Sequence, residues 1–393
     1  MRKLAENIFE VGTIDWDRRL FDELIPLPDG TSYNTYLIKG SEKNCLLDTV
    51  DPPKVNVLAE NLKAAGIKQL DYVVAHHAEQ DHSGTLPAIL ESYPHAKVVT
   101  NQKCRDMLID LLCISEDKFY VIEDSRKLSL GDKTLEFIST PWVHWPETFS
   151  SYCPEEKILF SCDFFGSHLA CSNLFVEDEC RVLESAKRYY AEIMMPFRKP
   201  IRNNLKKLED FDIGMIAPSH GPIYQNPKVI MDAYNKWTGE QVENKVVVAY
   251  VSMHGSTKKM TEYLVEKLIE KGIDVKQYNL TVTDIGELAM DTVDAATVIL
   301  GVPTTLTQAH PVAGYAVNLL NLLRPKTRYA GLLGSYGWGG KTVKQVTEGL
   351  PRLDVEFLEP VMIKGYPKQK DFEAIDKLTE QIEQKHKEDV NVK

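Results

Sequence analysis

The segment AHHAEQDHSG, residues 75–84, carries three histidines and two acids within seven positions. It directly follows the apolar run LDYVVA, which is typical of a short buried strand. Read as H-x-E-x-D-H, it offers four side chains that can bind a metal: His77, Glu79, Asp81 and His82. A solvated polar loop is the alternative, but four ligand-type residues in six positions favour a metal site.

Three more candidate ligands occur farther along the chain, each just past an apolar stretch. His144 follows LEFIST, Asp163 follows ILFSC, and His220 follows MIAPS. Open α/β architectures place their functional residues at the ends of strands. Taken singly, His144 and His220 would suit buried structural positions. Because all three residues repeat the same pattern, we expect them to converge with residues 77–82 at one edge of the sheets.

The order H-x-E-x-D-H followed by a distant His, Asp and His resembles the ligand order of the metallo-β-lactamase fold. Hydrolases of that fold have a second histidine where this chain has Glu79, and they usually bind zinc. With its glutamate and the segments HHAEQDHSGTLP, PWVHWPETF and APSHG, the chain is similar to the flavodiiron proteins. A carboxylate in place of an imidazole hardens the site, which favours redox-active iron over redox-silent zinc.

This resemblance implies a non-haem diiron site. One iron would be held by His77, Glu79 and His144, and the other by Asp81, His82 and His220, with Asp163 bridging the pair. His76 stays outside this ligand set, and His95 is expected at the surface. Relatives also place a tyrosine near the open face of the irons, which here corresponds to Tyr190, although a core position on an amphipathic helix explains Tyr190 equally well. His168 matches a further histidine near the site, and Asp22 stands where many relatives have histidine.

A second candidate site follows the apolar strand VVVAYV. The loop SMHGSTKKM joins this strand to a helix, and backbone N–H groups at such a helix N-terminus suit a phosphate. Thr257 is expected to cap the helix. The loop contains neither the GxGxxG of dinucleotide-binding proteins nor the GK[ST] of nucleotide triphosphatases.

Two further loops occupy comparable positions at the ends of strands. GVPTTLTQAHP follows AATVILG, and GSYGWGG follows YAGLL and supplies aromatic surface for a ring system. All three loops together resemble those of flavodoxins, which implies bound FMN rather than an empty domain. The predicted FMN-binding residues are Ser252, Met253, His254, Gly255, Ser256, Thr257, Pro303, Thr304, Thr305, Leu306, Thr307, Ser335, Tyr336, Gly337, Trp338, Gly339 and Gly340.

The secondary-structure pattern divides the chain into two parts. Up to about residue 240, short strands mix with helical stretches, which suggests sheets covered by helices. Beyond that point β and α alternate strictly, with helices expected over 257–271, 312–323, 341–350 and 371–386. This α/β pattern predicts a doubly wound parallel sheet of about five strands. The resemblance implies a metallo-β-lactamase-like αββα sandwich over residues 1–243 and a flavodoxin-like domain over residues 244–393.

Composition limits the function classes further. A chain of 393 residues is expected to form two domains, and its net charge of −11 argues against nucleic-acid binding. No signal peptide or membrane-spanning run is apparent, so we expect a cytoplasmic location without a membrane partner. Cys153, Cys162, Cys171 and Cys180 recur every nine residues. This spacing is too wide for a thiolate metal site, so we treat it as coincidence.

The family resemblance implies an oxidoreductase that reduces oxygen to water, nitric oxide to nitrous oxide, or both. The irons would be supplied with electrons by FMN, which an external donor such as rubredoxin, a flavin reductase or reduced deazaflavin must reduce. Family members pair head to tail, so a homodimer or a dimer of dimers is expected. The alternatives are a zinc hydrolase of the metallo-β-lactamase fold fused to a flavodoxin-like domain, and a flavin-containing electron carrier or gas sensor without turnover.

Overall fold

The computed structural model of the chain describes residues 1–393, which form two compact units. The first unit comprises Met1–Tyr189 and Phe197–Asn235, and the second comprises Tyr190–Pro196 and Lys236–Lys393. The division predicted after residue 243 falls at the start of the first strand of the second unit, β17 (Glu243–Tyr250), and stays a prediction.

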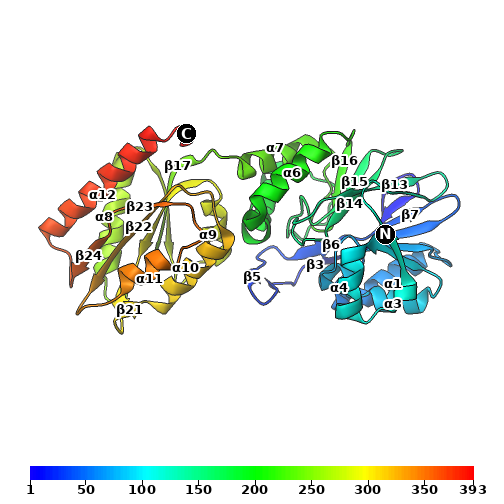
Figure 1. Cartoon of the computed structure of the whole chain (residues 1–393), viewed down its shortest axis with the longest axis horizontal. Helices are drawn as coiled ribbons and strands as arrows, with labels where there is room; N and C mark the ends of the chain where they lie inside the picture. The colour runs from blue at the N-terminus through cyan, green and yellow to red at the C-terminus, as the bar shows by residue number, and fades with distance from the viewer. The chain divides into compact units, whose positions relative to one another are not determined.

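The first unit contains two large β-sheets (Figure 1). The seven-stranded sheet has the order β1 (Arg2–Ala5), β2 (Ile8–Glu10), β7 (Tyr36–Lys39), β8 (Asn44–Leu47), β9 (Tyr72–Val74), β10 (Lys97–Asn101), β11 (Phe119–Ile122). The five-stranded sheet has the order β12 (Lys127–Ser129), β13 (Thr134–Ser139), β14 (Phe149–Cys153), β15 (Ile158–Cys162), β16 (Met215–Pro218). Two small ladders pair β3 (Thr13–Asp15) with β6 (Thr31–Tyr33), and β4 (Leu20–Phe21) with β5 (Ile25–Pro26).

Helices cover the outer faces of these sheets, so the unit is a helix–sheet–sheet–helix sandwich. The helices are α1 (Val55–Ala64), α2 (Gln80–Ser83), α3 (Leu86–Ser92), α4 (Gln102–Leu112), α5 (Glu179–Tyr189), α6 (Arg198–Leu208) and α7 (Pro227–Thr238). Successive strand residues point to opposite faces. In β8, Leu46 packs into a core with Leu58 of α1, whereas Leu47 packs with Phe160 of β15 between the sheets. Each such buried side chain stabilises the fold by about 1.5–3 kcal/mol.

The direction of the strands determines where their polar ends gather. β8, β9 and β10 are parallel, so their carboxyl ends lie at one edge of the first sheet. β15 and β16 are parallel in the second sheet, and β13 runs in the same direction because two antiparallel pairings separate it from β15. The predicted metal-binding residues follow β9, β13, β15 and β16 in the sequence. They therefore extend from the carboxyl ends of strands in both sheets.

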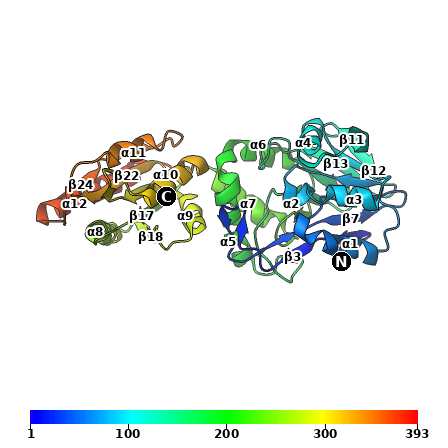
Figure 2. The same cartoon turned by 90° about the horizontal axis from the view of Figure 1, so that it is seen from below.

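The second unit is a parallel sheet with helices on both faces (Figure 2). Its order is β18 (Asp274–Asn279), β17, β19 (Ala295–Gly301), β22 (Tyr329–Tyr336), β23 (Glu356–Phe357), and β24 (Val361–Lys364) also pairs with β22. The fifth strand position is thus divided between β23 and β24, and the order is that of flavodoxin-like sheets. A short hairpin, β20 (Thr304–Thr305) with β21 (Gln308–Ala309), lies outside this sheet.

Two helices cover one face of this sheet and three cover the other. α8 (Ser256–Glu270) and α12 (Gln369–Glu388) share one core, and α9 (Ile285–Thr292), α10 (Pro311–Leu323) and α11 (Thr342–Glu348) share the other. The four predicted helices therefore correspond to α8, α10, α11 and α12. Thr257 was expected to cap α8, but Gly255 occupies the N-cap and Thr257 is a buried residue of the first turn. The left-handed φ of +88° at Gly255 explains the difference, because glycine adopts this conformation without strain.

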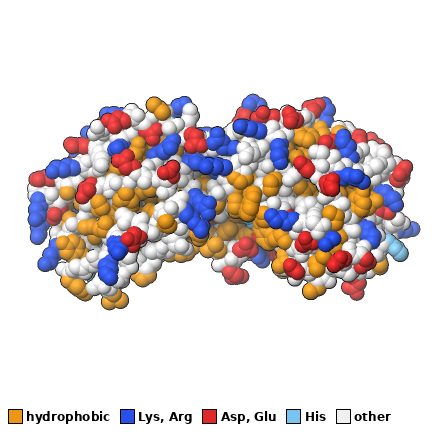
Figure 3. Space-filling view, in the orientation of Figure 1, with side chains coloured by type: hydrophobic (Ala, Val, Ile, Leu, Met, Phe, Trp, Pro, Cys, Tyr) orange, Lys and Arg blue, Asp and Glu red, His pale blue; other side chains and the backbone are white.

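Charged side chains are distributed over the surface without a large region of one sign on the face shown in Figure 3. Lys, Arg, Asp and Glu side chains alternate there, in keeping with a chain whose acids exceed its bases by eleven. None of the helices is both long and apolar enough to cross a lipid bilayer.

Candidate functional site

All seven predicted metal ligands come together in the first unit. His77, Glu79, His144 and Asp163 each offer a ligand atom, and these atoms lie within 4.8 Å of one another. The same holds for two overlapping groups, one of His77, Asp81 and His82 and one of His82, Asp163 and His220. Asp81 and His82 sit on the one-turn helix α2.

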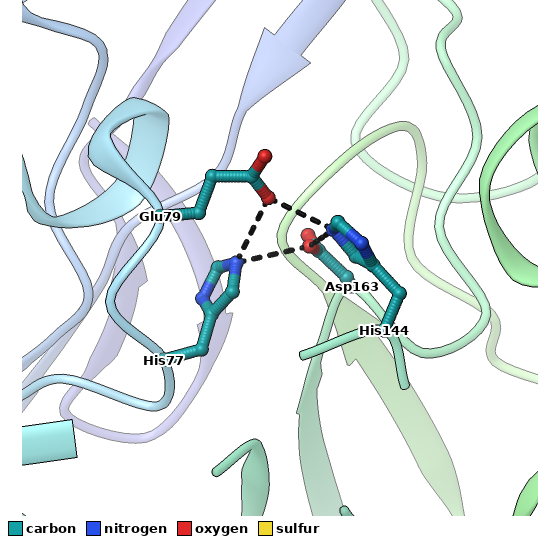
Figure 4. Close-up of side chains that lie close together, drawn as sticks. All are labelled: His77, Glu79, His144 and Asp163. Carbon is teal, nitrogen blue, oxygen red and sulfur yellow. Dashed lines mark hydrogen bonds and ion pairs between the residues drawn. The ribbon is translucent and has the colours of Figure 1, made fainter. Parts of the chain in front are cut away.

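The first group is arranged around Glu79 and Asp163 (Figure 4). Glu79 Oε2 lies 2.8 Å from His144 Nε2 and 3.3 Å from His77 Nε2. Asp163 Oδ2 lies 3.3 Å and 3.2 Å from the same two nitrogens. In this view the two imidazoles and two carboxylates point toward one another from separate segments of the chain.

The second group uses the other oxygen of Asp163. Asp163 Oδ1 lies 3.0 Å from His82 Nε2 and 3.5 Å from His220 Nε2. Asp81 Oδ2 lies 3.0 Å and 3.2 Å from these nitrogens. One oxygen of Asp163 thus faces each group, which is the arrangement of a carboxylate shared by two neighbouring cations.

The unpaired polar atoms fit two bound cations. His82 Nε2 and His220 Nε2 are only 3.0 Å apart, and His220 Nδ1 donates a hydrogen bond to Ser32 O at 2.7 Å. In neutral His220 the proton is therefore on Nδ1, so its Nε2 presents a lone pair. Both carboxylate oxygens of buried Asp81 lack a hydrogen-bond donor. Buried polar groups of this kind are stable when they are hydrogen-bonded, paired or bound to a metal.

Electrostatics favour positive charge at the cluster. Burial opposes ionisation of Asp163, but His82 and His77 hold the pKa of this carboxyl well below its ordinary value. Burial also opposes the imidazolium form of His144, yet Glu79 and Asp163 raise the pKa of His144 to about 9. A buried cluster that attracts protons this strongly also attracts metal cations, which compete for the same nitrogen and oxygen atoms.

His76, although adjacent to the ligands, bonds away from the cluster. Its Nδ1 lies 2.7 Å from Asp48 Oδ2, and its Nε2 lies 2.7 Å from Ser151 Oγ. Both ring nitrogens are therefore in use, which agrees with leaving His76 out of the ligand set. The sequence analysis did not single out Asp48, although it directly follows strand β8 just as the ligands follow theirs.

The tyrosine beside the cluster is Tyr189. Its ring lies 4.9 Å from the ring of His168 and 5.9 Å from that of His220. Tyr190 instead belongs to the second unit, where its hydroxyl donates to Trp237 O at 3.4 Å. The role predicted for Tyr190 stays a prediction. Helix α5 buries Val182, Ser185, Ala186 and Tyr189, so the helical period of the apolar residues was the signal for Tyr189.

His168 and Asp22 also lie close to the cluster. His168 Nδ1 is 2.9 Å from Thr31 Oγ1, and its ring lies 4.7 Å from that of His220. Asp22 lies between β4 and β5, and burial, followed by the charges of Glu79 and Asp81, raises the pKa of its carboxyl. Its carboxyl group is therefore within electrostatic reach of the cluster of predicted ligands.

The predicted FMN loops form a pocket at the carboxyl ends of the strands of the second unit. It is lined by Ser252, Met253, His254, Ser256, Thr257, Pro303, Thr304, Ser335, Tyr336, Gly337 and Gly365. Gly255, Thr305, Leu306, Thr307, Trp338, Gly339 and Gly340 belong to the same loops but do not line it, and their role stays a prediction. Gly365, which follows β24, was missed because a single glycine after a strand is a weak signal.

Contacts between the loops hold this pocket together. Ser252 Oγ accepts hydrogen bonds from Gly255 N and Lys258 N, both at 3.2 Å. Thr257 Oγ1 lies 3.4 Å from Ser335 Oγ, which joins the first loop to the third. A Cβ on Gly255 would meet open space in front of the N-terminus of α8. Backbone N–H groups at such an uncovered helix start fit a phosphate group.

Comparisons with known proteins cover both units. A family model described as ODP family beta lactamase matches residues 31–221. The nitric oxide reductase of Moorella thermoacetica is 35% identical over 362 residues, which cover 90% of each chain. The solved structure of rubredoxin oxygen:oxidoreductase from the anaerobe Desulfovibrio gigas has a TM-score of 0.93 at 29% identity and 98% coverage of each chain. The flavodiiron protein from Giardia intestinalis has a TM-score of 0.92 at 27% identity, over 98% of this chain and 96% of that one.

Proposed function

The chain belongs to the flavodiiron protein family of oxidoreductases, and we propose that it reduces oxygen to water, nitric oxide to nitrous oxide, or both. The observation that carries this proposal is the position of Asp163. Its Oδ2 faces His77 and His144, and its Oδ1 faces His82 and His220. A hydrolase that uses one zinc would not require this shared carboxylate.

The proposed ligand set assigns three side chains and the shared carboxylate to each iron. His77, Glu79 and His144 would hold one iron, Asp81, His82 and His220 the other, and Asp163 would bridge them. When bound, the irons supply the redox chemistry and the coordination positions for a diatomic gas. The protein holds the ligands in place and limits the access of water to them. The side chains of His77, His82, His220 and Asp163 are buried, and only that of His144 is 14% exposed.

The second unit is proposed to bind FMN, which supplies electrons when reduced. The N-terminus of α8 and the loop from Ser252 to Thr257 would hold the phosphate. The loops containing Pro303 and Tyr336 would flank the ring system. The seven cysteines are all free, and none is paired in a CxxC motif. An external donor such as rubredoxin, a flavin reductase or reduced deazaflavin is proposed to reduce the FMN.

A head-to-tail homodimer, or a dimer of such dimers, is proposed to bring one subunit's flavin to the other subunit's irons. Exposed apolar side chains near each site support this assembly. Trp142 is exposed two residues before His144, and Met253 and Trp338 are exposed on the predicted flavin loops. A cytoplasmic location is proposed as well.

The proposal is tested by loading the protein with iron and FMN, reducing it chemically without oxygen, and adding either gas. Repeated consumption of oxygen or nitric oxide is expected, and the ratio of the two rates defines the preferred substrate. Metal analysis is expected to give two irons per chain. Zinc alone with ester or phosphodiester hydrolysis, or a single stoichiometric binding event without turnover, would contradict the proposal.

A further inference from the structure

Cys162 contacts the proposed iron ligand His77 on the side that faces away from the metal cluster. Its Sγ lies 3.4 Å from His77 Nδ1, whereas His77 Nε2 faces Glu79 and Asp163. Both Cys162 and His77 are buried. The other three buried thiols do not contact a histidine: Cys45 contacts Leu46 O at 3.7 Å, Cys104 contacts Ala75 O at 3.8 Å, and Cys153 contacts Glu155 Oε2 at 3.5 Å.

The backbone of β15 has an irregular conformation where it makes this contact. In a regular strand, residues 162 and 163 would point to opposite faces. The pairing of β15 with β16 shifts register between Phe160 and Cys162, and Cys162 has a φ of +55°. Cys162 and Asp163 consequently reach the two different nitrogens of the same imidazole. Positive φ costs a residue with a Cβ about 1–2 kcal/mol, and such outliers cluster at functional sites.

The direction of the hydrogen bond follows from which nitrogen would bind metal. If His77 Nε2 binds a cation, the ring proton must be on Nδ1, which then donates to the sulfur of Cys162. A ligand histidine usually donates this proton to a carboxylate, a carbonyl or water, which fixes its tautomer and orientation. Two of the other proposed ligand histidines differ from His77: His220 Nδ1 donates to Ser32 O, and His82 Nδ1 has no hydrogen-bond partner.

We propose that Cys162 is a positioning residue that accepts the Nδ1 proton of His77 and thereby fixes the tautomer and orientation in which His77 binds iron. The assignment rests on the iron site proposed above, but it concerns metal affinity and not turnover. It also makes the histidines of the two irons unequal, because one is held through a thiol and another through a carbonyl. The period-nine spacing of the cysteines plays no part in this role.

Three substitutions separate the hydrogen bond from simple packing. Cys162→Ala keeps the Cβ and the backbone conformation but removes the acceptor. Cys162→Ser restores an acceptor, and its shorter side chain suits the shorter N–H···O hydrogen bond. Cys45→Ala removes an equally buried thiol from the same unit without touching a ligand. Ferrous affinity is measured anaerobically on iron-depleted, refilled protein by competition with a coloured chelator.

We expect Cys162→Ala to bind ferrous iron about 10–100-fold more weakly than the wild type, the usual effect of losing a hydrogen-bond partner of a metal ligand. Cys162→Ser and Cys45→Ala should stay close to the wild type. In cobalt-substituted protein, NMR should show a slowly exchanging Nδ1 proton on His77 in the wild type and the serine variant, and fast exchange in the alanine variant. Unchanged affinity in Cys162→Ala, an equal loss in Cys45→Ala, or failure of serine to restore binding would each overturn the proposal. A wild type that binds no iron would overturn the proposed function instead.

Discussion

His144 is the proposed ligand that joins β13 of the second sheet to Glu79 of the first. Its Nε2 lies 2.8 Å from Glu79 Oε2 and 3.3 Å from Asp163 Oδ2, so it closes one half of the metal cluster. Its side chain is also the most exposed of that half, at 14% against 10% for Glu79. A change at this position should affect the irons without disturbing the flavin pocket of the other unit.

Losing a hydrogen-bond partner of a metal ligand lowers metal affinity about 10–100-fold. We predict a larger loss of iron affinity for His144→Ala, because this variant lacks a ligand itself. Gas reduction should fall in proportion, while FMN content stays at the wild-type level. Iron and flavin are measured on the same samples by metal analysis and absorbance. His95→Ala, which alters an exposed histidine of the same unit, serves as the matched control. An unchanged rate in His144→Ala would remove His144 from the ligand set.

Gly255 is the N-cap of α8 in the loop predicted to hold the FMN phosphate. Its φ is +88°, and a Cβ there would project into open space before the start of α8. We predict that Gly255→Val weakens FMN binding by more than about tenfold, or about 1.4 kcal/mol, while iron content is unchanged. Fluorescence titration of the flavin-free protein with FMN measures the effect.

A control for backbone strain is available at the other end of the same helix. Gly272 also has a positive φ, +73°, and open space around its Cβ position, but it lies outside the pocket. Gly272→Val should show the same loss of stability, about 1–2 kcal/mol, and retain FMN. Equal FMN binding by both variants would mean that residues 252–257 do not hold the phosphate.

At the scale of secondary-structure elements, the strand ends could be predicted but their irregularities could not. The proposed ligands could be singled out because H-x-E-x-D-H concentrates metal-binding types directly after an apolar run, and His144, Asp163 and His220 repeat that pattern. The contact of Cys162 depends on a register shift and a positive φ, which leave no trace in residue type.

The helical periodicity of α5 distinguishes the two neighbouring tyrosines at its end. Tyr189 and Tyr190 are adjacent, and only the spacing of the buried positions of α5 separates the residue facing the cluster from its neighbour. The start of α8 was misjudged by two residues because Gly255 replaces a side-chain cap with a left-handed backbone. Turn conformation thus explains most of what sequence reasoning missed.

Helix α12 contains a buried histidine that should make the second unit sensitive to acid. His386 Nδ1 lies 2.8 Å from Asn244 Oδ1, and its Nε2 lies 2.7 Å from Thr297 Oγ1. Burial lowers the pKa of His386 to about 4, against the opposing charge of Asp389. The unfolded chain therefore binds a proton near the ordinary pKa of histidine, whereas the folded chain binds it only in stronger acid.

Because the unfolded state takes up more protons in this range, the stability contributed by His386 is present at neutral pH and is lost as the pH falls from 6.5 to about 4. We predict that the wild type loses about 2 kcal/mol more than His386→Gln between about pH 7 and pH 4.5. Hydrogen exchange of the α12 amides at both pH values measures this difference, with exposed His95→Gln as the control. Equal losses in the wild type and His386→Gln would contradict the prediction.

At the scale of the whole molecule, the proposed iron and flavin sites belong to different units of one chain. Each site is built from the loops at the carboxyl ends of its own strands, so each should form without the other. This independence allows a chain to lose one site and keep the second. The proposed head-to-tail dimer then makes a prediction that differs from electron transfer within a single chain.

We predict that mixing His144→Ala with Gly255→Val restores gas reduction that neither variant has alone. If the flavin of one subunit serves the irons of its partner, a mixed dimer contains two such combinations of flavin and irons. In one combination both sites are intact, and in the other both the flavin site and the iron site are defective. Random exchange of equal amounts makes half of the dimers mixed, so about a quarter of the wild-type activity should return. Transfer within one chain would restore none, because each chain of the mixed dimer lacks one of its two sites. Mixing His144→Ala with His220→Ala, which both lack an iron ligand, provides the control, and recovery there would show that the regained activity does not come from pairing a flavin with a partner's irons.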